Sequence, residues 1–71
     1  LFYMQTDIAT TVKALRKTYG LTQEDLAMKS GVGLCFIRSL EQGKRTLRMD
    51  KVTQLLDYFN YSLTAVPNAV N

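Results

Sequence analysis

Apolar residues recur at helical spacing along most of this chain, and the pattern predicts four helices around one shared core. The first helix is expected over about residues 6–20, where Thr6 or Asp7 can cap its start and Gly20 can end it. Its apolar positions, in steps of four, three and four, are Ile8, Val12, Leu15 and Tyr19. The cations expected on its outer face and in its last turn, where they suit the helix dipole, are Lys13, Arg16 and Lys17.

Residues 22–43 predict two short helices joined by a tight turn. Thr22 can cap the first of them, because its hydroxyl reaches a free backbone N–H, and Asp25 stands where the acidic partner of a capping box belongs. Gly31 can adopt the left-handed conformation that ends this helix. The arrangement is a helix-turn-helix. The small core between its two helices is expected to contain Leu26, Ala27, Val32, Ile37 and Leu40.

A fourth helix is predicted to begin between Thr46 and Asp50 and to end at Asn60. Its apolar set, at a period of about 3.6 residues, is Met49, Val52, Leu55, Leu56 and Phe59. Residues 61–66 then alternate in the manner of a strand, which Pro67 ends.

A single strand cannot satisfy its own backbone groups, so we expect residues 61–66 to pair with the same strand of a second copy. The alternative is an extended or helical tail. The residues expected at this dimer contact are Tyr61, Leu63, Ala65 and Val66.

The order Leu-Thr-Gln-Glu-Asp-Leu-Ala at residues 21–27, followed by Gly31-Val32 and then by Ile37, Leu40, Glu41 and Gly43, resembles the Cro/repressor-type (XRE family) helix-turn-helix proteins. Phe36-Ile37, the turn at residues 43–46 and the tail after Asn60 resemble HipB-type antitoxins within that family. The resemblance implies an all-α, lambda-repressor-like DNA-binding domain over residues 6–60, with the strand at 61–66 pairing across a dimer. An N-terminal arm over residues 1–5, in which Met4 is a candidate start, and a flexible tail over 67–71 complete the expected organisation.

Composition excludes several classes of protein. With 71 residues there is room for one small domain, and such a small core usually needs a disulfide, a metal or a partner subunit. The chain has one cysteine and no histidine, so neither an internal disulfide nor a metal site is expected. No apolar run is long enough to span a membrane, and a cytoplasmic location is expected. We expect no enzyme and no cofactor, because there are no paired carboxylates, activated nucleophile or phosphate-loop glycines.

Positive charge is concentrated in and after the second helix of the motif. Residues 38–51 carry five basic and two acidic side chains, a net charge of +3, which equals the net charge of the whole chain. A charge run is often only a solvated face, but beside a helix-turn-helix it favours contact with nucleic acid. In such proteins the second helix enters the major groove, and its early outward residues reach base edges. The expected base contacts are Gly33, Leu34, Cys35, Arg38 and Ser39.

Arg38 is the leading candidate base reader because a guanidinium can form a bidentate pair with guanine. The alternatives are a phosphate contact or a surface ion pair. Leu34 and Cys35 are apolar candidates for thymine methyls, or signs that the protein reads DNA shape instead. Glu41 is expected to be structural, as an acceptor from the turn at residues 43–46 or as a partner of Arg45. The expected phosphate contacts are Thr22, Gln23, Gln42, Lys44, Arg45 and Arg48.

The function expected from the sequence is a homodimeric repressor that binds a palindromic operator in double-stranded DNA. The resemblance adds a HipBA-like toxin–antitoxin operon, in which this chain would autorepress its promoter and hold a HipA-type kinase toxin inactive. The alternatives are a repressor unconnected to any toxin and an interaction module that kept the fold but lost DNA binding.

Overall fold

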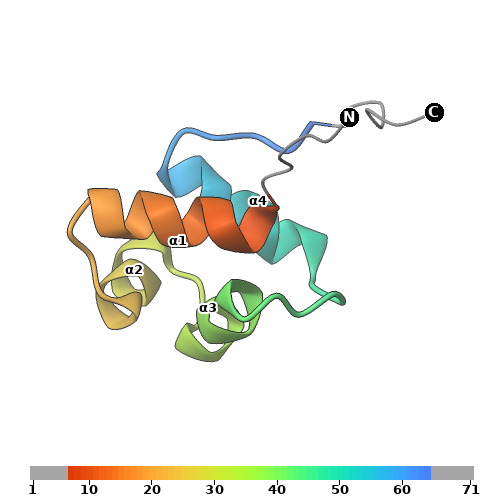
Figure 1. Ribbon diagram of the computed structural model, residues 1–71, viewed down its shortest axis with the longest axis horizontal. Coiled ribbons are helices and arrows are strands. Elements are labelled where there is room, and N and C mark those ends of the chain that lie inside the picture. The colour runs from red at the N-terminus through yellow and green to blue at the C-terminus, as the bar shows by residue number, and fades with distance from the viewer. Residues whose placement is uncertain (1–6, 65–71) are drawn as a thin grey trace, which may run out of the picture.

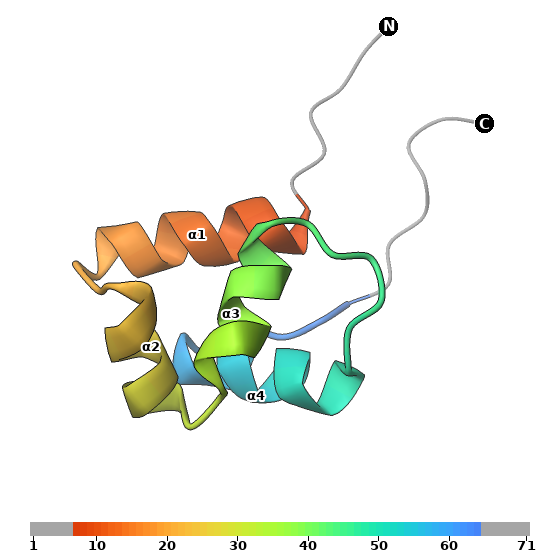
Figure 2. The ribbon, with the colours of Figure 1, turned by 90° about the horizontal axis from the view of Figure 1, so that it is seen from below.

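Four helices form the part of the chain that the computed structural model describes, residues 7–64. They are α1 (Ile8–Thr18), α2 (Gln23–Ser30), α3 (Leu34–Glu41) and α4 (Met49–Tyr58). Helix α3 packs against both α1 and α2, and α2 also packs against α4, as Figures 1 and 2 show. The predicted four-helix, all-α fold is therefore confirmed. The expected arm at residues 1–5 and tail at 67–71, together with Thr6, lie outside the described residues.

Side-chain caps begin α1 and α2, and a left-handed residue ends α2, as the sequence predicts. The side chain of Asp7 accepts a hydrogen bond from the Thr10 amide at 2.9 Å and begins α1. Thr22 and Asp25 form the complete capping box of α2: the Asp25 amide donates to Oγ1 of Thr22 at 3.0 Å, and the Thr22 amide donates to Oδ2 of Asp25 at 3.1 Å. Gly31, at φ +79°, ends α2 in the left-handed conformation. These local contacts fix the first and last residues of α2, and so the position of the turn between α2 and α3.

One apolar core joins the four helices. Its members are all between 0% and 4% exposed and are Val12, Leu26, Val32, Ile37, Leu40, Val52, Leu55, Leu56 and Phe59. Ala27 is half-buried and packs against this core, as its small side chain at the α2–α3 contact predicts. Truncating one of the fully buried leucines to alanine is expected to cost about 2–5 kcal/mol, a large part of the stability of so small a domain.

Two predicted apolar positions lie outside the core. Met49 is 64% exposed, because it stands in the first turn of α4 and Leu47, from the preceding loop, packs against the core instead. Tyr19 follows the last residue of α1 and is exposed, although its ring forms a T-shaped pair with that of Phe59, with centroids 5.1 Å apart. Helical periodicity places both residues on the core-facing side of their helices, but it does not show where along the helix the core ends.

The described part of the predicted strand, residues 61–64, forms no strand in the single chain, and the amide of Tyr61 donates to the Leu56 carbonyl at 2.9 Å. Ala65 and Val66 lie outside the described residues. A strand that pairs only between two copies needs the second copy, so this prediction stays a prediction. Figure 1 shows residues 61–64, in blue, on the side of the domain opposite α3.

Candidate nucleic-acid interface

The outward side of α3 carries the five residues predicted to reach bases. Gly33 caps the helix in an extended conformation and is exposed, as are Cys35 and Arg38. Leu34 and Ser39 are half-buried. On the opposite side of α3, the side chains of Ile37 and Leu40 are fully buried. The predicted division of α3 into an inner and an outer side is thus present, and Phe36 is half-buried against the core, as expected of a packing residue.

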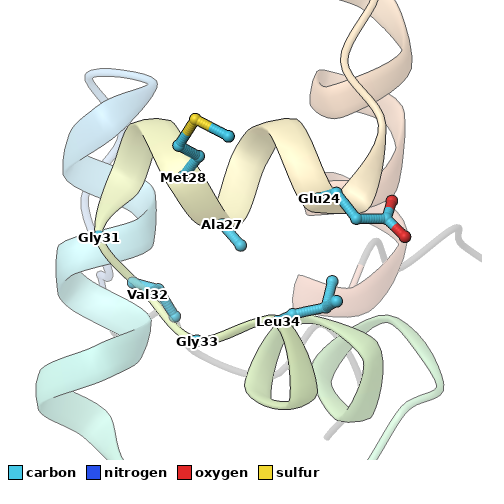
Figure 3. Close-up of a pocket in the computed structure, with 7 residues that line it drawn as sticks. All are labelled: Glu24, Ala27, Met28, Gly31, Val32, Gly33 and Leu34. Atoms are coloured by element: carbon cyan, nitrogen blue, oxygen red, sulfur yellow. The ribbon is translucent and has the colours of Figure 1, made fainter.

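A groove of about 470 Å³ runs between α2 and the start of α3. Figure 3 shows the turn from Gly31 to Gly33 at one end of the groove and Glu24 at the other. Ala27 lines it from α2 and Leu34 from α3, so its walls are mainly apolar. Leu34 therefore presents an apolar side chain to any ligand that binds at the beginning of α3.

A second hollow, of about 310 Å³, separates the outer side of α3 from the basic loop, residues 43–48. Cys35 and Ser39 line it from α3, and Lys44 and Arg48 line it from the loop. Gln42, Lys44 and Arg45 are exposed, and neither Lys44 nor Arg45 forms an ion pair within residues 7–64. Cations on this side of α3 thus lie next to the predicted reading residues.

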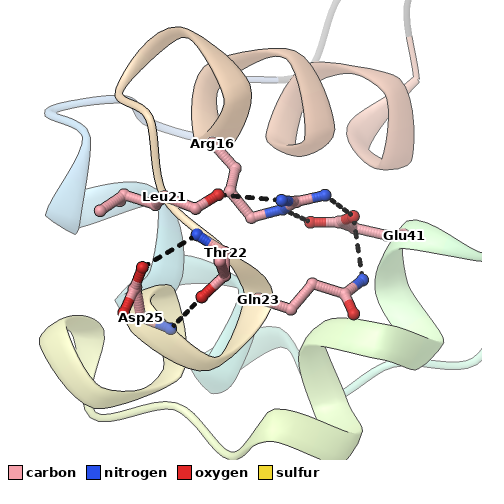
Figure 4. A network of polar contacts seen from close by, with 6 residues as sticks. All are labelled: Arg16, Leu21, Thr22, Gln23, Asp25 and Glu41. Atoms are coloured by element: carbon pink, nitrogen blue, oxygen red, sulfur yellow. Dashed lines mark hydrogen bonds and ion pairs between the residues drawn. The ribbon is translucent and has the colours of Figure 1, made fainter.

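Behind this surface, Arg16, Gln23 and Glu41 form a polar network that joins α1, α2 and α3 (Figure 4). Nε of Arg16 donates to Oε2 of Glu41 at 2.8 Å, and Nη2 donates to Oε1 at 3.0 Å. Nη1 of Arg16 donates to the Leu21 carbonyl at 2.9 Å, and Nε2 of Gln23 donates to Oε1 of Glu41 at 3.1 Å. Glu41 is therefore structural, but its predicted partners, Arg45 and the turn at residues 43–46, are wrong.

The carboxylate of Glu41 is charged inside this network. Its side chain is 3% exposed and that of Arg16 is 12% exposed. Burial alone would raise the pKa of Glu41, but the hydrogen bonds from Arg16 and Gln23 and the charge of Arg16 outweigh it, so the pKa lies below its ordinary value of 4.5. A buried ion pair with satisfied partners can hold three helices in fixed relation, whereas loss of one partner leaves an uncompensated charge.

The residues predicted to hold phosphates at the start of α2 already have internal bonds. The hydroxyl and amide of Thr22 belong to the capping box, and Nε2 of Gln23 is held by Glu41. The amides of Gln23 and Glu24 lie in the first turn, where an α-helix offers no acceptor. An anion at this helix end would therefore meet backbone N–H groups beside a Gln23 side chain of fixed orientation.

Two further arginines on this surface are paired with carboxylates. Nη2 of Arg38 donates to Oε2 of Glu24 at 3.2 Å, which links α3 to α2. Arg48 caps α4 without a side-chain cap bond, and its guanidinium donates to both carboxylate oxygens of Asp50 at 3.2 and 2.7 Å. Of the candidate DNA contacts, Arg38 and Arg48 thus form ion pairs, and Lys44 and Arg45 form none among the described residues.

Sequence reasoning missed Arg16 and Glu24 as parts of the site. Arg16 is four residues after Val12, and Glu41 is four residues after Ile37, so helical spacing places both polar residues beside core positions. A charged residue at such a position indicates a buried partner. No comparable signal marks Glu24, because its pairing with Arg38 depends on how α2 crosses α3.

The described part of the chain contains neither a cluster of metal-binding side chains nor a membrane-spanning helix. Among residues 7–64, no group of three or more acidic or cysteine side chains is placed to hold a metal ion. None of the four helices has the length and apolar character needed to cross a membrane.

Comparisons with known proteins agree with the geometry. A family model described as helix-turn-helix matches residues 12–66. An uncharacterised HTH-type transcriptional regulator of Sinorhizobium fredii (strain NBRC 101917 / NGR234), y4mF, is 44% identical over 57 residues, which are 80% of this chain and 75% of the relative. No solved structure matches the chain significantly. With its capping box, its left-handed Gly31 and the buried inner side of α3, the chain belongs to the helix-turn-helix family of the Cro/repressor (XRE) type.

Proposed function

We propose that this chain is a sequence-specific DNA-binding transcriptional repressor that acts as a homodimer. The observation that carries the proposal is the two-sided α3: Ile37 and Leu40 are fully buried, while Cys35 and Arg38 face solvent, Cys35 beside the basic loop and Arg38 beside Glu24 of α2. A helix held in this way can enter the major groove, where Arg38 would read a base. The relative from Sinorhizobium fredii is named a transcriptional regulator, which supports the same role.

Phosphate contacts on both sides of α3 complete the proposed interface. At one side, the first turn of α2 offers backbone N–H groups and the Gln23 side chain, which Glu41 orients at 3.1 Å. At the other side, Lys44 and Arg45 offer cations without internal partners among residues 7–64, with Gln42 and Arg48 nearby in the sequence. Such contacts would fix the register of α3 in the groove without reading sequence themselves.

Dimerisation through the tail is supported by apolar surface that residues 7–64 leave uncovered. Tyr61 is 47% exposed and Leu63 is 45% exposed. Both line a hollow of about 310 Å³ with Ile8 and Leu56. A further hollow, of about 240 Å³ and distinct from the one beside the basic loop, is lined by Leu63 and the exposed Met49. A second copy that paired its residues 61–66 with these would cover this surface, and a palindromic operator would need the two α3 helices of such a dimer about 34 Å apart.

The antitoxin role is the finer part of the proposal. It rests on the resemblance of residues 43–46 and of the tail after Asn60 to HipB-type antitoxins, and it implies a HipA-type kinase as a partner. Its test is the neighbouring gene: a kinase-like product that co-purifies with this chain, and whose activity the chain inhibits, would support it. The absence of such a product would leave a repressor unconnected to a toxin.

An interaction module without DNA binding is the second candidate. The observation that favours it is the apolar start of α3, where Leu34 lines a largely apolar groove and Cys35 is exposed. A protein partner could use such a surface as readily as thymine methyls could.

Titration of the chain onto its own promoter DNA and onto a scrambled duplex, each at two salt concentrations, separates the two candidates. A repressor binds the promoter more tightly than the scrambled DNA, and its affinity falls steeply with salt as counterions are released. Equal, weak binding to both duplexes would favour the interaction module and contradict the proposed function.

A further inference from the structure

Arg38 shares the surface of the interface with an acidic residue on the facing helix. Its Nη2 atom lies 3.2 Å from Oε2 of Glu24, in the first turn of α2. The two side chains are 50% and 62% exposed, so the pair stands at the surface rather than in the core. Glu24 also lines one end of the groove between α2 and α3 (Figure 3). DNA that approaches Arg38 therefore meets Glu24 at the same time.

The contact with Glu24 leaves Arg38 able to read a base. A guanidinium has five N–H donors, and the bond to Glu24 uses one of them, on Nη2. The remaining donors still include two neighbouring N–H groups that can form a bidentate contact with O6 and N7 of guanine. Because those acceptors are neutral, Arg38 can bind guanine and keep its bond to Glu24.

A phosphate is a different ligand for the same arginine. A phosphate oxygen that binds Arg38 either displaces the carboxylate of Glu24 or places a second negative charge beside it. Both cost free energy that the guanine contact does not cost. The carboxylate therefore lowers the affinity of Arg38 for the DNA backbone more than its affinity for guanine.

From this geometry we propose that Glu24 is a specificity-determining residue that makes Arg38 a guanine reader rather than a phosphate contact. The inference rests on the proposed function, since it needs Arg38 at the DNA. Without such a role, an acidic residue on a DNA-facing surface would be expected only to weaken DNA binding. Because exposed ion pairs are weak, the expected effect of Glu24 on selectivity is about two- to five-fold.

The test compares the wild-type chain with the variants Glu24→Gln, Arg38→Ala and the double variant. Each is titrated onto the promoter site, onto sites in which each G·C pair is replaced in turn, and onto unrelated DNA. Asp57→Asn is the matched control, because it changes the net charge equally and Asp57 forms no ion pair within residues 7–64. Each selectivity is a ratio of affinities measured on one protein sample, so a partly unfolded variant does not distort it.

Glu24→Gln is expected to lower the preference for guanine at the position that Arg38 reads by about two- to five-fold, mainly through tighter binding to the substituted and unrelated DNA. Its salt dependence on unrelated DNA should steepen by about one unit, because Arg38 then neutralises a phosphate. The double variant should show the same selectivity as Arg38→Ala alone, and Asp57→Asn the wild-type selectivity.

Three outcomes would overturn the inference. If Glu24→Gln keeps the wild-type selectivity and salt dependence while Arg38→Ala loses its guanine preference, Glu24 has no part in reading and the proposed function survives. If Asp57→Asn changes selectivity as much as Glu24→Gln, the effect is one of net charge. If the wild-type chain shows no guanine preference at all, both the inference and the base-reading role of Arg38 fail.

Discussion

The guanidinium of Arg16 and the carboxylate of Glu41 connect α1 to the last residue of α3 through two hydrogen bonds, from Nε to Oε2 at 2.8 Å and from Nη2 to Oε1 at 3.0 Å. The same carboxylate accepts from Gln23 in the first turn of α2. One ion pair thus holds the two helices of the motif and the helix behind them. The proposed reading surface depends on this pair, because it fixes where the start of α2 lies relative to α3.

Loss of the arginine should therefore strongly destabilise the domain. Arg16→Met leaves the carboxylate of Glu41, which is 3% exposed, without a cation, and the expected cost is about 3–5 kcal/mol. Urea unfolding followed by circular dichroism measures it. Lys17→Met, at an exposed position in the last turn of α1, is the control and should change stability by no more than about 1 kcal/mol.

The double variant Arg16→Met/Glu41→Leu gives the complementary result. Removing both charges leaves no buried unpaired ion, so most of the lost stability should return. A double variant as unstable as Arg16→Met would show that the charge of Glu41 is not the cause.

Acid should destabilise the domain partly through Glu41. The pKa of Glu41 is lowered in the folded chain, so its contribution to stability is present above its unfolded value of about 4.5 and is lost as the pH falls through the lower folded pKa. Glu41→Gln removes this contribution, so the urea concentration at the unfolding midpoint should decrease less steeply as the pH is lowered. Some decrease with falling pH should remain, because the pKa values of Asp7 and Asp25 are also lowered by their capping bonds. An unchanged acid profile in Glu41→Gln would contradict this role.

Local chemistry made the helix ends and most of the core predictable. The capping box of Thr22 and Asp25, the left-handed Gly31 and the left-handed Asn60, at φ +63°, each depend on residues that are neighbours in the sequence. The buried positions follow from helical periodicity, with Met49 and Tyr19 as exceptions because they stand at the start of α4 and just after the end of α1.

The ion pairs were not predictable, since they join residues from different helices. Arg16 is 25 residues from Glu41, and Arg38 is 14 residues from Glu24. Whether such residues meet depends on how the helices cross. The periodicity of one helix carries no information about that crossing. The partner of Glu41 was therefore assigned wrongly, although its structural role was expected. The strand predicted at residues 61–66 stays a prediction for a similar reason, because it would pair only with a second chain.

Arg38→Ala should relax operator selectivity and leave the fold intact. Its side chain is half-exposed, and the loss of a bidentate guanine contact should reduce discrimination at one base pair by about 1–3 kcal/mol. Titration onto single-base variants of the site measures the change. Lys17→Ala removes an exposed cation from α1 and serves as the control. Unchanged selectivity in Arg38→Ala would remove Arg38 as a reader.

Lys44→Ala should weaken binding on every DNA sequence by a similar factor. Lys44 is exposed in the basic loop and is proposed to contact a phosphate, so its loss should flatten the salt dependence by about one unit. Affinities for the promoter and for scrambled DNA over a series of salt concentrations measure both effects. A loss confined to the promoter would instead place Lys44 at a base.

Removal of the chain from Tyr61 onward should yield monomers, as measured by light scattering. A milder variant is Leu63→Asp, which places a charge on a side chain that is 45% exposed and proposed to be covered in the dimer. Thr53→Asp, at an exposed position of α4, is the control and should leave the dimer intact. A dimer that persists without the tail would show that the interface lies elsewhere.

DNA is proposed to bind to the outer side of α3, and the most direct test is to measure backbone amide protection and chemical shifts, residue by residue, with and without promoter DNA. We predict that the changes concentrate at Gly33–Ser39, at the first turn of α2 and at Lys44 and Arg45, and are absent with scrambled DNA. Changes confined to α4 and residues 61–64, or no change at α3, would contradict the account.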